Sequence, residues 1–471
     1  MKFFWVSLWL MLPSFCFAQN ANRTISLTLT DQPLEVILDS VAQKTNFFFS
    51  YNSTIIPADQ KFSCNAQEMR LIDFLEELLQ GTDLTYFFSK DQIILRKDDS
   101  SISRLPSGPS NFVIYGWARD AESGEHIPGV NVYLNGTTIG AVTNHNGYYK
   151  FDNVPYGIYN LVFSHVSYDK VLFEVSVEGE GGILVNGDLS LKMNQLAGIE
   201  VASTRLIDEK DWEKTFEVFR KEFIGDTYNS RRCKILNPEV LEFYTDETGD
   251  TLFAEAERAL RIRNEALGYM IIYELEYFQN FEDGLTYSGN VRFESLPLLN
   301  PKDAAKWKRN RKRTYRGSLR HFLKSLTENN LKKEGFRIYR TENVISLTDK
   351  DTEEIEGRDV VIKGKSLFWR MVFEDFIFIE YVKEKESELY LINMTKDIQQ
   401  KALLTSDNLL FISRKPDVQR SLLKLKDGTV DIDANGHISQ PLMVSTIGYW
   451  AWQRFADLLP IEYDPKKDRI R

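Results

Sequence analysis

The stretch that decides the fold at the centre of this chain spans residues 116–168 and reads GWARDAESGEHIPGVNVYLNGTTIGAVTNHNGYYKFDNVPYGIYNLVFSHVSY. Its apolar residues alternate with polar ones in short runs, which is the period of a half-buried β-strand. Glycine, asparagine and proline separate these runs about every ten residues, as in small antiparallel sandwiches. With its flanks, the pattern predicts a seven-strand-type β-sandwich over residues 112–195. The expected strands include residues 113–117, 130–134, 148–151, 159–163 and 172–177.

This stretch resembles the carboxypeptidase regulatory-like domain. The residues that carry the resemblance are Pro128, Gly136, Thr137, Gly140, Thr143, Gly147, Tyr149, Phe151, Val154, Pro155, Gly157 and Tyr159. Asn144 stands where the family usually has aspartate, which weakens the implication of a calcium site. In carboxypeptidases this module is the appended sandwich and not the zinc-bearing part, so the resemblance implies no peptidase activity.

The histidines agree with that expectation. A His-x-x-Glu zinc pair needs an acid three residues after a histidine. The residues at that distance from the five histidines are Gly129, Tyr148, Tyr168, Lys324 and Gln440. There is also no P-loop, no Gly-x-Ser-x-Gly elbow and no Gly-x-Gly-x-x-Gly after a strand. The sequence therefore predicts no metal, no cofactor and no catalytic residue, while leaving the C-terminal region open.

The first 18 residues, MKFFWVSLWLMLPSFCFA, predict a signal peptide. One cation is followed by an apolar run to Leu12, and Ala18 suits cleavage before Gln19. This run is shorter than the roughly 20 residues that span a bilayer. Cys16 lacks a Leu-led lipobox, which disfavours a lipoprotein. We expect an exported chain in the periplasm or on the periplasmic face of the outer membrane, with no transmembrane helix after cleavage.

The composition is that of a globular protein, with 43% apolar and 27% charged residues. Aromatics at 13% favour β-rich structure. The net charge of −10 argues against nucleic acid as the partner. After signal cleavage the cysteines are Cys64 and Cys233, in different expected domains; one disulfide or two free thiols both fit an exported chain.

Residues 24–97 predict a small domain of order β-α-β-β-α-β-β. Strand-like alternation begins at Ile25, and helical spacing follows from Leu34 to Val41. A second helical stretch ends at Gly81, before a closing hairpin. A Ser/Pro/Gly-rich linker, residues 98–111, separates this domain from the sandwich.

Two segments of this domain, ISLTLTDQPLEVILDSVAQKTNFFFSYN and QEMRLIDFLEELLQGTDLTYFFSKDQIIL, resemble the secretin and TonB short N-terminal domain. In outer-membrane receptors that domain is a periplasmic docking module. The resemblance implies a periplasmic or outer-membrane protein as the partner of residues 24–97.

Residues 205–471 predict a mixed α+β domain. A helix is expected around Trp212–Phe223 and a strand over Tyr269–Tyr277, with further strands at 291–293, 360–362, 376–382 and 389–394. The segments FIGDTYNSRRCKILNP, LRIRNEALGYMIIYELEYF, RTYRGSLRHFLKSL and GYWAWQRFADLLPIEY resemble the C-terminal region of uncharacterised Bacteroidetes envelope proteins. That resemblance implies a lineage and no activity.

A basic helix is expected within residues 302–320, KDAAKWKRNRKRTYRGSLR. One interpretation is a contact surface for an anion, a glycan or an anionic membrane, and a second is a solvated helix that pairs with the chain's own acids. A third, nucleic acid bound with the help of Trp307 and Tyr315, is disfavoured because an exported protein rarely meets nucleic acid. The candidate contact residues are Lys306, Lys308, Arg309, Arg311, Lys312, Arg313 and Arg316.

Residues 431–436, DIDANG, match the beginning of an EF-hand loop. Position twelve of that loop is Leu442, where a bidentate acid is required. A hairpin turn between strands at 430–432 and 437–439 is the favoured interpretation.

Taken together, these features predict a multidomain, β-rich α+β chain that works as a non-catalytic binding or adaptor protein of the cell envelope, linked to TonB-type transport or signalling. Two other functions stay open: a periplasmic hydrolase with a site in residues 205–471, and a small outer-membrane barrel. The ligand, the partner and the oligomeric state are not determined by the sequence.

Overall fold

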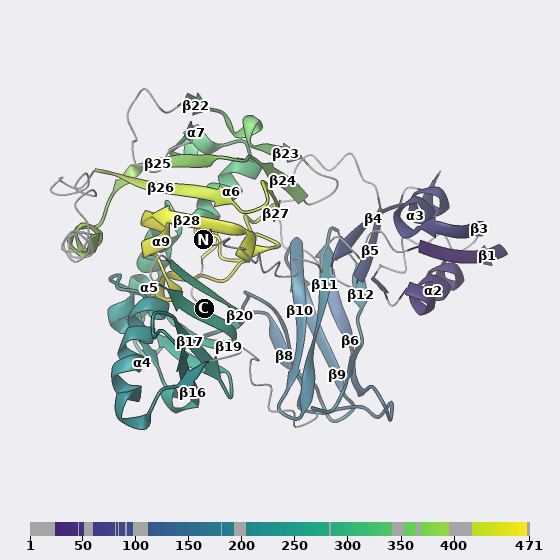
Figure 1. The fold of residues 1–471 in the computed structure, drawn as a ribbon, viewed down its shortest axis with the longest axis horizontal. Helices are drawn as coiled ribbons and strands as arrows, with labels where there is room; N and C mark the ends of the chain where they lie inside the picture. The colour runs from purple at the N-terminus through teal and green to yellow at the C-terminus, as the bar shows by residue number, and fades with distance from the viewer. Residues whose placement is uncertain are drawn as a thin grey trace, which may run out of the picture. The chain divides into compact units, whose positions relative to one another are not determined.

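A computed structural model describes most of the three expected domains (Figure 1). The signal peptide and the linker lie outside the described residues, which are 24–45, 47–50, 60–80, 82, 84–89, 92–97, 112–179, 181–192, 204–281, 284–341, 353–363, 368–394 and 417–468. The chain divides into two compact units. The first contains residues up to 104 together with 181–184, and the second contains 105–180 and 185–471.

The first unit has the element order β-α-β-β-α-β-β. Its elements are β1 (Thr24–Pro33), α2 (Leu34–Thr45), β2 (Phe48–Ser50), β3 (Lys61–Arg70), α3 (Leu71–Leu79), β4 (Leu84–Ser89) and β5 (Gln92–Lys97), with β12 (Gly182–Leu184) grouped with it. β1 pairs antiparallel with β3, whereas β5 lies between β2 and β4. The apolar face of each helix is buried in one shared core, as the helical spacing of Leu34, Ile37, Leu38 and Val41 predicts.

The sandwich opens the second unit. Its strands are β6 (Phe112–Asp120), β7 (Asn131–Leu134), β8 (Gly140–Val142), β9 (Tyr148–Val154), β10 (Gly157–His165), β11 (Tyr168–Val177) and β13 (Gly187–Leu189). One sheet has the order β11-β10-β7-β8, and in the other β6 pairs with β9 and β13. The rings of Tyr149 and Phe163, one from each sheet, meet edge to face at 5.4 Å. The Tyr149 hydroxyl, which is buried, donates to the Val185 carbonyl at 2.8 Å, so its polar end is satisfied.

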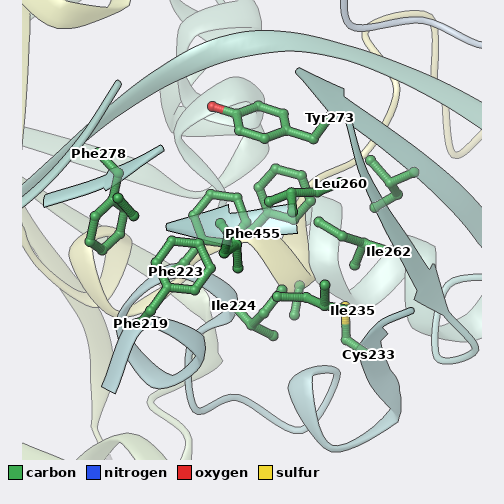
Figure 2. Packing of buried hydrophobic residues seen from close by; sticks show 14 of the residues in the cluster. Phe219, Phe223, Ile224, Cys233, Ile235, Leu260, Ile262, Tyr273, Phe278 and Phe455 are labelled. Atoms are coloured by element: carbon green, nitrogen blue, oxygen red, sulfur yellow. The ribbon is translucent and has the colours of Figure 1, made fainter. Parts of the chain in front are cut away.

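A seven-stranded sheet with one long helix follows. Its elements are β14 (Arg205–Leu206), α4 (Glu209–Ile224), β15 (Cys233–Ile235), β16 (Leu241–Thr245), β17 (Leu252–Ala256), β18 (Leu260–Asn264), β19 (Tyr269–Phe281) and β20 (Gly284–Ser295). Phe219 and Phe223 of α4 pack against this sheet (Figure 2). Cys233 lies in the same core, and both it and Cys64 are free thiols.

The rest of the second unit forms another body with its own core. Its elements are α5 (Pro301–Tyr315), α6 (Leu319–Thr327), α7 (Leu331–Glu334), β21 (Phe336–Thr341), β22 (Glu353–Ile355), β23 (Val361–Lys363), β24 (Phe368–Val372), β25 (Phe376–Lys385), β26 (Val418–Leu425), β27 (Thr429–Asp433), β28 (Val444–Gly448) and α9 (Tyr449–Trp452). Single 3-10 turns are η2 (Ser230–Arg232), η3 (Pro238–Val240), η4 (Gly357–Asp359), η6 (Pro441–Met443) and η7 (Phe455–Asp457). Within the described part of the chain, no helix is both long and apolar enough to cross a bilayer.

Two features differ from the expectation. The described part of residues 205–471, expected to be one domain, contains two separate hydrophobic cores. Residues 388–394, expected to include a strand, are helical. The Ser387 hydroxyl accepts the backbone N–H of Leu389 at 3.2 Å, and the Ser387 carbonyl accepts that of Leu391 at 3.2 Å. This serine acts as a helix start, and such capping overrides a short apolar run of strand-forming residues.

A C-terminal strap, residues 449–463, joins the three bodies of the second unit. Trp450 is buried in the second core of the C-terminal region, and its indole N–H donates to the Gly317 carbonyl at 2.6 Å. Phe455 is buried in the first core, with its ring centroid 4.5 Å from that of Phe223 (Figure 2). The strap therefore contributes one aromatic anchor to each core.

The end of the strap docks on the sandwich turn between β7 and β8. The backbone N–H of Ile461 donates to the Gly136 carbonyl at 2.8 Å, and Glu462 accepts the backbone N–H of Thr138 at 2.7 Å. Gly136 has a φ of +80°, and a Cβ placed there would lie 2.4 Å from the Ile461 side chain. A residue with a side chain is thus excluded at Gly136 by both backbone strain and the strap.

Asp457, in the strap, makes the free energy of unfolding depend on pH. Its carboxylate is buried, although part of the residue is accessible, and burial raises its pKa to about 6 despite the bond that the Asn229 amide donates to it at 2.7 Å. Because the folded state holds this proton more tightly than the unfolded state, stability from this group is lost as pH rises through the folded pKa. In Asp457→Asn no such loss occurs. We expect the unfolding free energy of the variant, relative to wild type, to increase by roughly 2–3 kcal/mol from about pH 4 to about pH 8. Urea unfolding across that range measures it, and parallel pH curves for the two proteins would contradict it.

Candidate anion-binding surface

Helix α5 is fixed at both ends. Asn300 caps it, its side chain accepting the backbone N–H of Lys302 at 2.9 Å, and Pro301 occupies the first turn. Gly317, with a φ of +71°, separates α5 from α6, so the single basic helix expected over residues 302–320 is two helices.

One face of α5 is bound to the loop that precedes β19. The indole N–H of Trp307 donates to the Glu265 carbonyl at 3.0 Å, and the Asn310 amide donates to the Ala266 carbonyl at 2.8 Å. The spacing of Trp307, Asn310 and Arg311 places them on one side of the helix. The opposite side is consequently held toward solvent.

Arg311 belongs to the inner face. Its guanidinium donates to the Leu267 carbonyl at 2.7 Å, lies 3.4 Å from the Asp468 carboxylate and stacks over Tyr269 at 4.2 Å. The side chains of Arg311 and Asp468 are only 8% and 5% exposed. Arg311 is therefore a structural residue, and its place among the expected contact residues is corrected.

Five of the other expected residues gather on the outer face. Lys308, Arg309, Lys312, Arg313 and Arg316 are exposed and, with Ala305 and Glu384, line an open groove of about 510 Å³. Their spacing of three and four residues is that of one helix face. We call these five side chains the cationic face. Lys306 is half-buried and is not part of the groove lining.

Glu384 of β25 is the counter-charge in the groove. Its carboxylate lies 3.6 Å from the Arg316 guanidinium. Burial raises the pKa of Glu384, and Arg316 and Arg313 act in the opposite direction. Sequence reasoning missed this residue because it lies almost 70 positions from the helix, on a strand whose local pattern carries no sign of the groove.

Tyr228 extends the cationic face toward the loop after α4. Its ring lies beneath two guanidinium groups, 5.4 Å from Arg231 and 5.7 Å from Arg313. The side chain is 47% exposed. Cation–π contacts of this kind hold arginines in place without neutralising them.

Lys308, Arg309 and Lys312 make no side-chain hydrogen bond or ion pair within the described part of the chain. They also stand as like charges at i,i+4 and i,i+3 with other members of the face, an arrangement that weakens a helix by a few tenths of a kcal/mol per pair. The interpretation that this helix simply pairs with the chain's own acids is not supported for these three residues.

The DIDANG segment forms the expected hairpin. The Asp433 carboxylate accepts the backbone N–H groups of Asn435 and His437, both at 2.8 Å, and Ile432 bridges to Ile438. Burial raises the pKa of Asp433 and lowers the pKa of His437. Among the residues that the structure describes, no group of three His, Cys, Asp or Glu side chains is placed to hold a metal.

Comparison with known proteins agrees with the sandwich. Residues 114–201 match the CarboxypepD_reg-like domain. The resemblance found in the sequence is thereby confirmed for this part of the chain. A search of curated proteins finds no match.

Solved structures are only weakly similar to this chain. A cohesin–X-dockerin complex from Acetivibrio cellulolyticus shares 22% identity over 17% of this chain and 56% of that one, with a TM-score of 0.15. The major pilin subunit of Bacillus cereus shares 14% over 23% and 37%, with a TM-score of 0.16. A DUF3823 family protein from Bacteroides uniformis shares 12% over 40% and 100%, with a TM-score of 0.14. This chain thus covers about half or less of the first two, and such low scores carry no functional information.

Proposed function

We propose that this chain is a non-catalytic binding protein of the cell envelope whose cationic face recognises a ligand bearing several negative charges. The observation that carries the proposal is the set of three exposed, unpartnered cations, Lys308, Arg309 and Lys312, in the described part of the chain, on a helix whose other side is rigidly bonded to the protein. Like charges three and four residues apart, such as Arg309 with Lys312 and Lys308 with Lys312, weaken a helix, so folding alone does not explain why the positions are all basic.

The length of the cationic face suits a ligand that carries more than one anionic group. Positions 308 and 316 are eight residues apart, which is about 12 Å along an α-helix. A single phosphate cannot contact the whole row, whereas a ligand with two or more phosphate or carboxylate groups can. Arginine binds such groups bidentately, and lysine adds unspecific charge.

The adaptor half of the proposal concerns the first unit. Its resemblance to the secretin and TonB short N-terminal domain supports docking to a periplasmic or outer-membrane protein after export. β2 and β4 are the edge strands of its three-stranded sheet, and an edge strand offers unpaired backbone groups for β-augmentation. Crosslinked pull-downs with and without residues 24–97 test this half; recovery of the same envelope proteins by both would refute it.

Titration with inorganic tripolyphosphate tests the anion-binding half. We expect the intact protein to bind it and the triple variant Lys308→Gln, Arg309→Gln, Lys312→Gln to bind about tenfold more weakly, because three surface ion pairs of roughly 0.5 kcal/mol are lost. The matched control is Lys210→Gln, Lys214→Gln, Lys221→Gln on α4, which removes the same charge from another helix. Equal weakening in both variants would mean that only net charge matters, and the proposed site would be wrong.

A further inference from the structure

We infer that the cationic face docks on a lipid bilayer whose surface carries anionic headgroups. The inference rests on the proposed function, since the same cations make the contact, and it names the partner. Three independent features of the surface around α5 carry it: the length of the charged row, an exposed apolar segment at one end, and an exposed tyrosine at its side.

The charged row is longer than the groove. Lys302 is exposed in the first turn of α5 and lies on the same helix face as Arg309 and Arg316, at seven-residue intervals. From position 302 to 316 the helix rises about 21 Å. A row of this length matches a plane of many headgroups better than one small ligand. Each lysine or arginine near an anionic membrane surface contributes about fivefold in affinity.

The segment before α5 exposes two leucines. Leu299 is 86% exposed and Leu298 41% exposed, directly before the cap residue Asn300. Leu299 is the most exposed large apolar side chain in the described part of the chain. In water an exposed leucine side chain contributes no favourable burial free energy. Insertion into the boundary between headgroups and acyl chains removes its surface from water, which is favourable.

Tyr228 connects an interfacial aromatic to the cations. Its ring contacts the guanidinium groups of Arg313, a member of the cationic face, and of Arg231. Tyrosine prefers the headgroup level of a bilayer, where its ring is half-buried and its hydroxyl stays wet. Charge, an apolar insertion and an interfacial tyrosine are the elements of peripheral membrane binding, and a soluble phosphate ligand would need only the first.

Charge complementarity must be local, because the chain as a whole has a net charge of −10. An anionic bilayer repels most of this protein and attracts the region around α5. The attraction is therefore oriented, and it weakens as salt shortens the screening length to less than about 10 Å.

Co-sedimentation of the intact protein with vesicles tests the inference. Binding is expected to vesicles in which about a third of the lipid is phosphatidylglycerol, not to pure phosphatidylcholine, and to be reversed by high salt. The triple variant at positions 308, 309 and 312 should bind about a hundredfold more weakly. Leu299→Ser should bind about tenfold more weakly. The controls, the α4 triple variant and Val166→Ser at an apolar residue that is 80% exposed, should bind like wild type.

The other outcomes separate the two proposals. If tripolyphosphate binds through Lys308, Arg309 and Lys312 but the vesicles do not, the membrane inference is wrong and the proposed anion site stands. The membrane inference is equally wrong if a random-sequence oligonucleotide binds through these residues in place of vesicles. If Leu299→Ser changes nothing while the triple variant abolishes vesicle binding, the surface is purely electrostatic and the insertion of Leu299 is refuted. If neither anion nor vesicle binds, both proposals fail.

Discussion

Replacing Phe455 with alanine is expected to lower the free energy of unfolding by about 3–5 kcal/mol. Phe455 is only 1% exposed and packs its ring against Phe223 at 4.5 Å and Tyr273 at 4.9 Å between centroids. Because the surrounding aromatics are held by the sheet and by α4, the site cannot collapse to fill the volume that is removed. Denaturant unfolding of the intact protein measures the loss.

Leu458→Ala is the control within the same strap. This side chain is 36% exposed, so its truncation should cost less than about 1 kcal/mol. If Phe455→Ala is as mild as Leu458→Ala, the strap does not anchor the first core of the C-terminal region.

The second large effect is expected at Arg311, where Arg311→Gln should destabilise the protein by about 3–5 kcal/mol. The substitution leaves the Asp468 carboxylate buried without its charge partner and removes the bond to the Leu267 carbonyl and the stacking on Tyr269. Thermal unfolding measures this loss. Tripolyphosphate affinity, measured below the unfolding temperature, should stay within about twofold of wild type because the side chain does not reach the groove.

Arg309→Gln, two positions away, is expected to show the reverse pattern: weaker anion binding with unchanged stability. Arg309 is exposed in the groove, so its loss should weaken tripolyphosphate binding by about twofold and leave thermal stability unchanged. If Arg311→Gln weakens anion binding while leaving stability intact, the division of α5 into an inner and an outer face is incorrect.

The sandwich and most local elements could be predicted from the sequence because their signals are short-range. The glycines and prolines between residues 128 and 157 define turns, and the alternation between them defines strands. The inner face of α5 could also have been predicted from the sequence. Trp307, Arg311 and Tyr315 recur every four residues and so share one side of the helix, and the tryptophan and the tyrosine indicate that this side is buried. That spacing places Arg311 on the buried side, although it was predicted to be a contact residue.

The strap and the groove could not be predicted in this way. Ile461 and Gly136 are bonded across more than 300 residues, and Glu384 meets Arg316 across almost 70. Neither contact leaves a periodic pattern, because each joins parts of the chain that are far apart in the sequence. The helix at residues 388–394 was missed for a different reason, since one capping serine outweighed the strand propensity of Leu389–Ile392.

The central claim is that the cationic face, and no other basic part of the molecule, receives a polyanionic ligand. Lysine acetylation of the unmodified protein, read by mass spectrometry with and without tripolyphosphate, tests it most directly. We predict that the ligand slows acetylation of Lys308 and Lys312 and leaves Lys214 and Lys221 on α4 at their unliganded rates. Equal protection of all four lysines, or protection confined to residues outside α5, would contradict it.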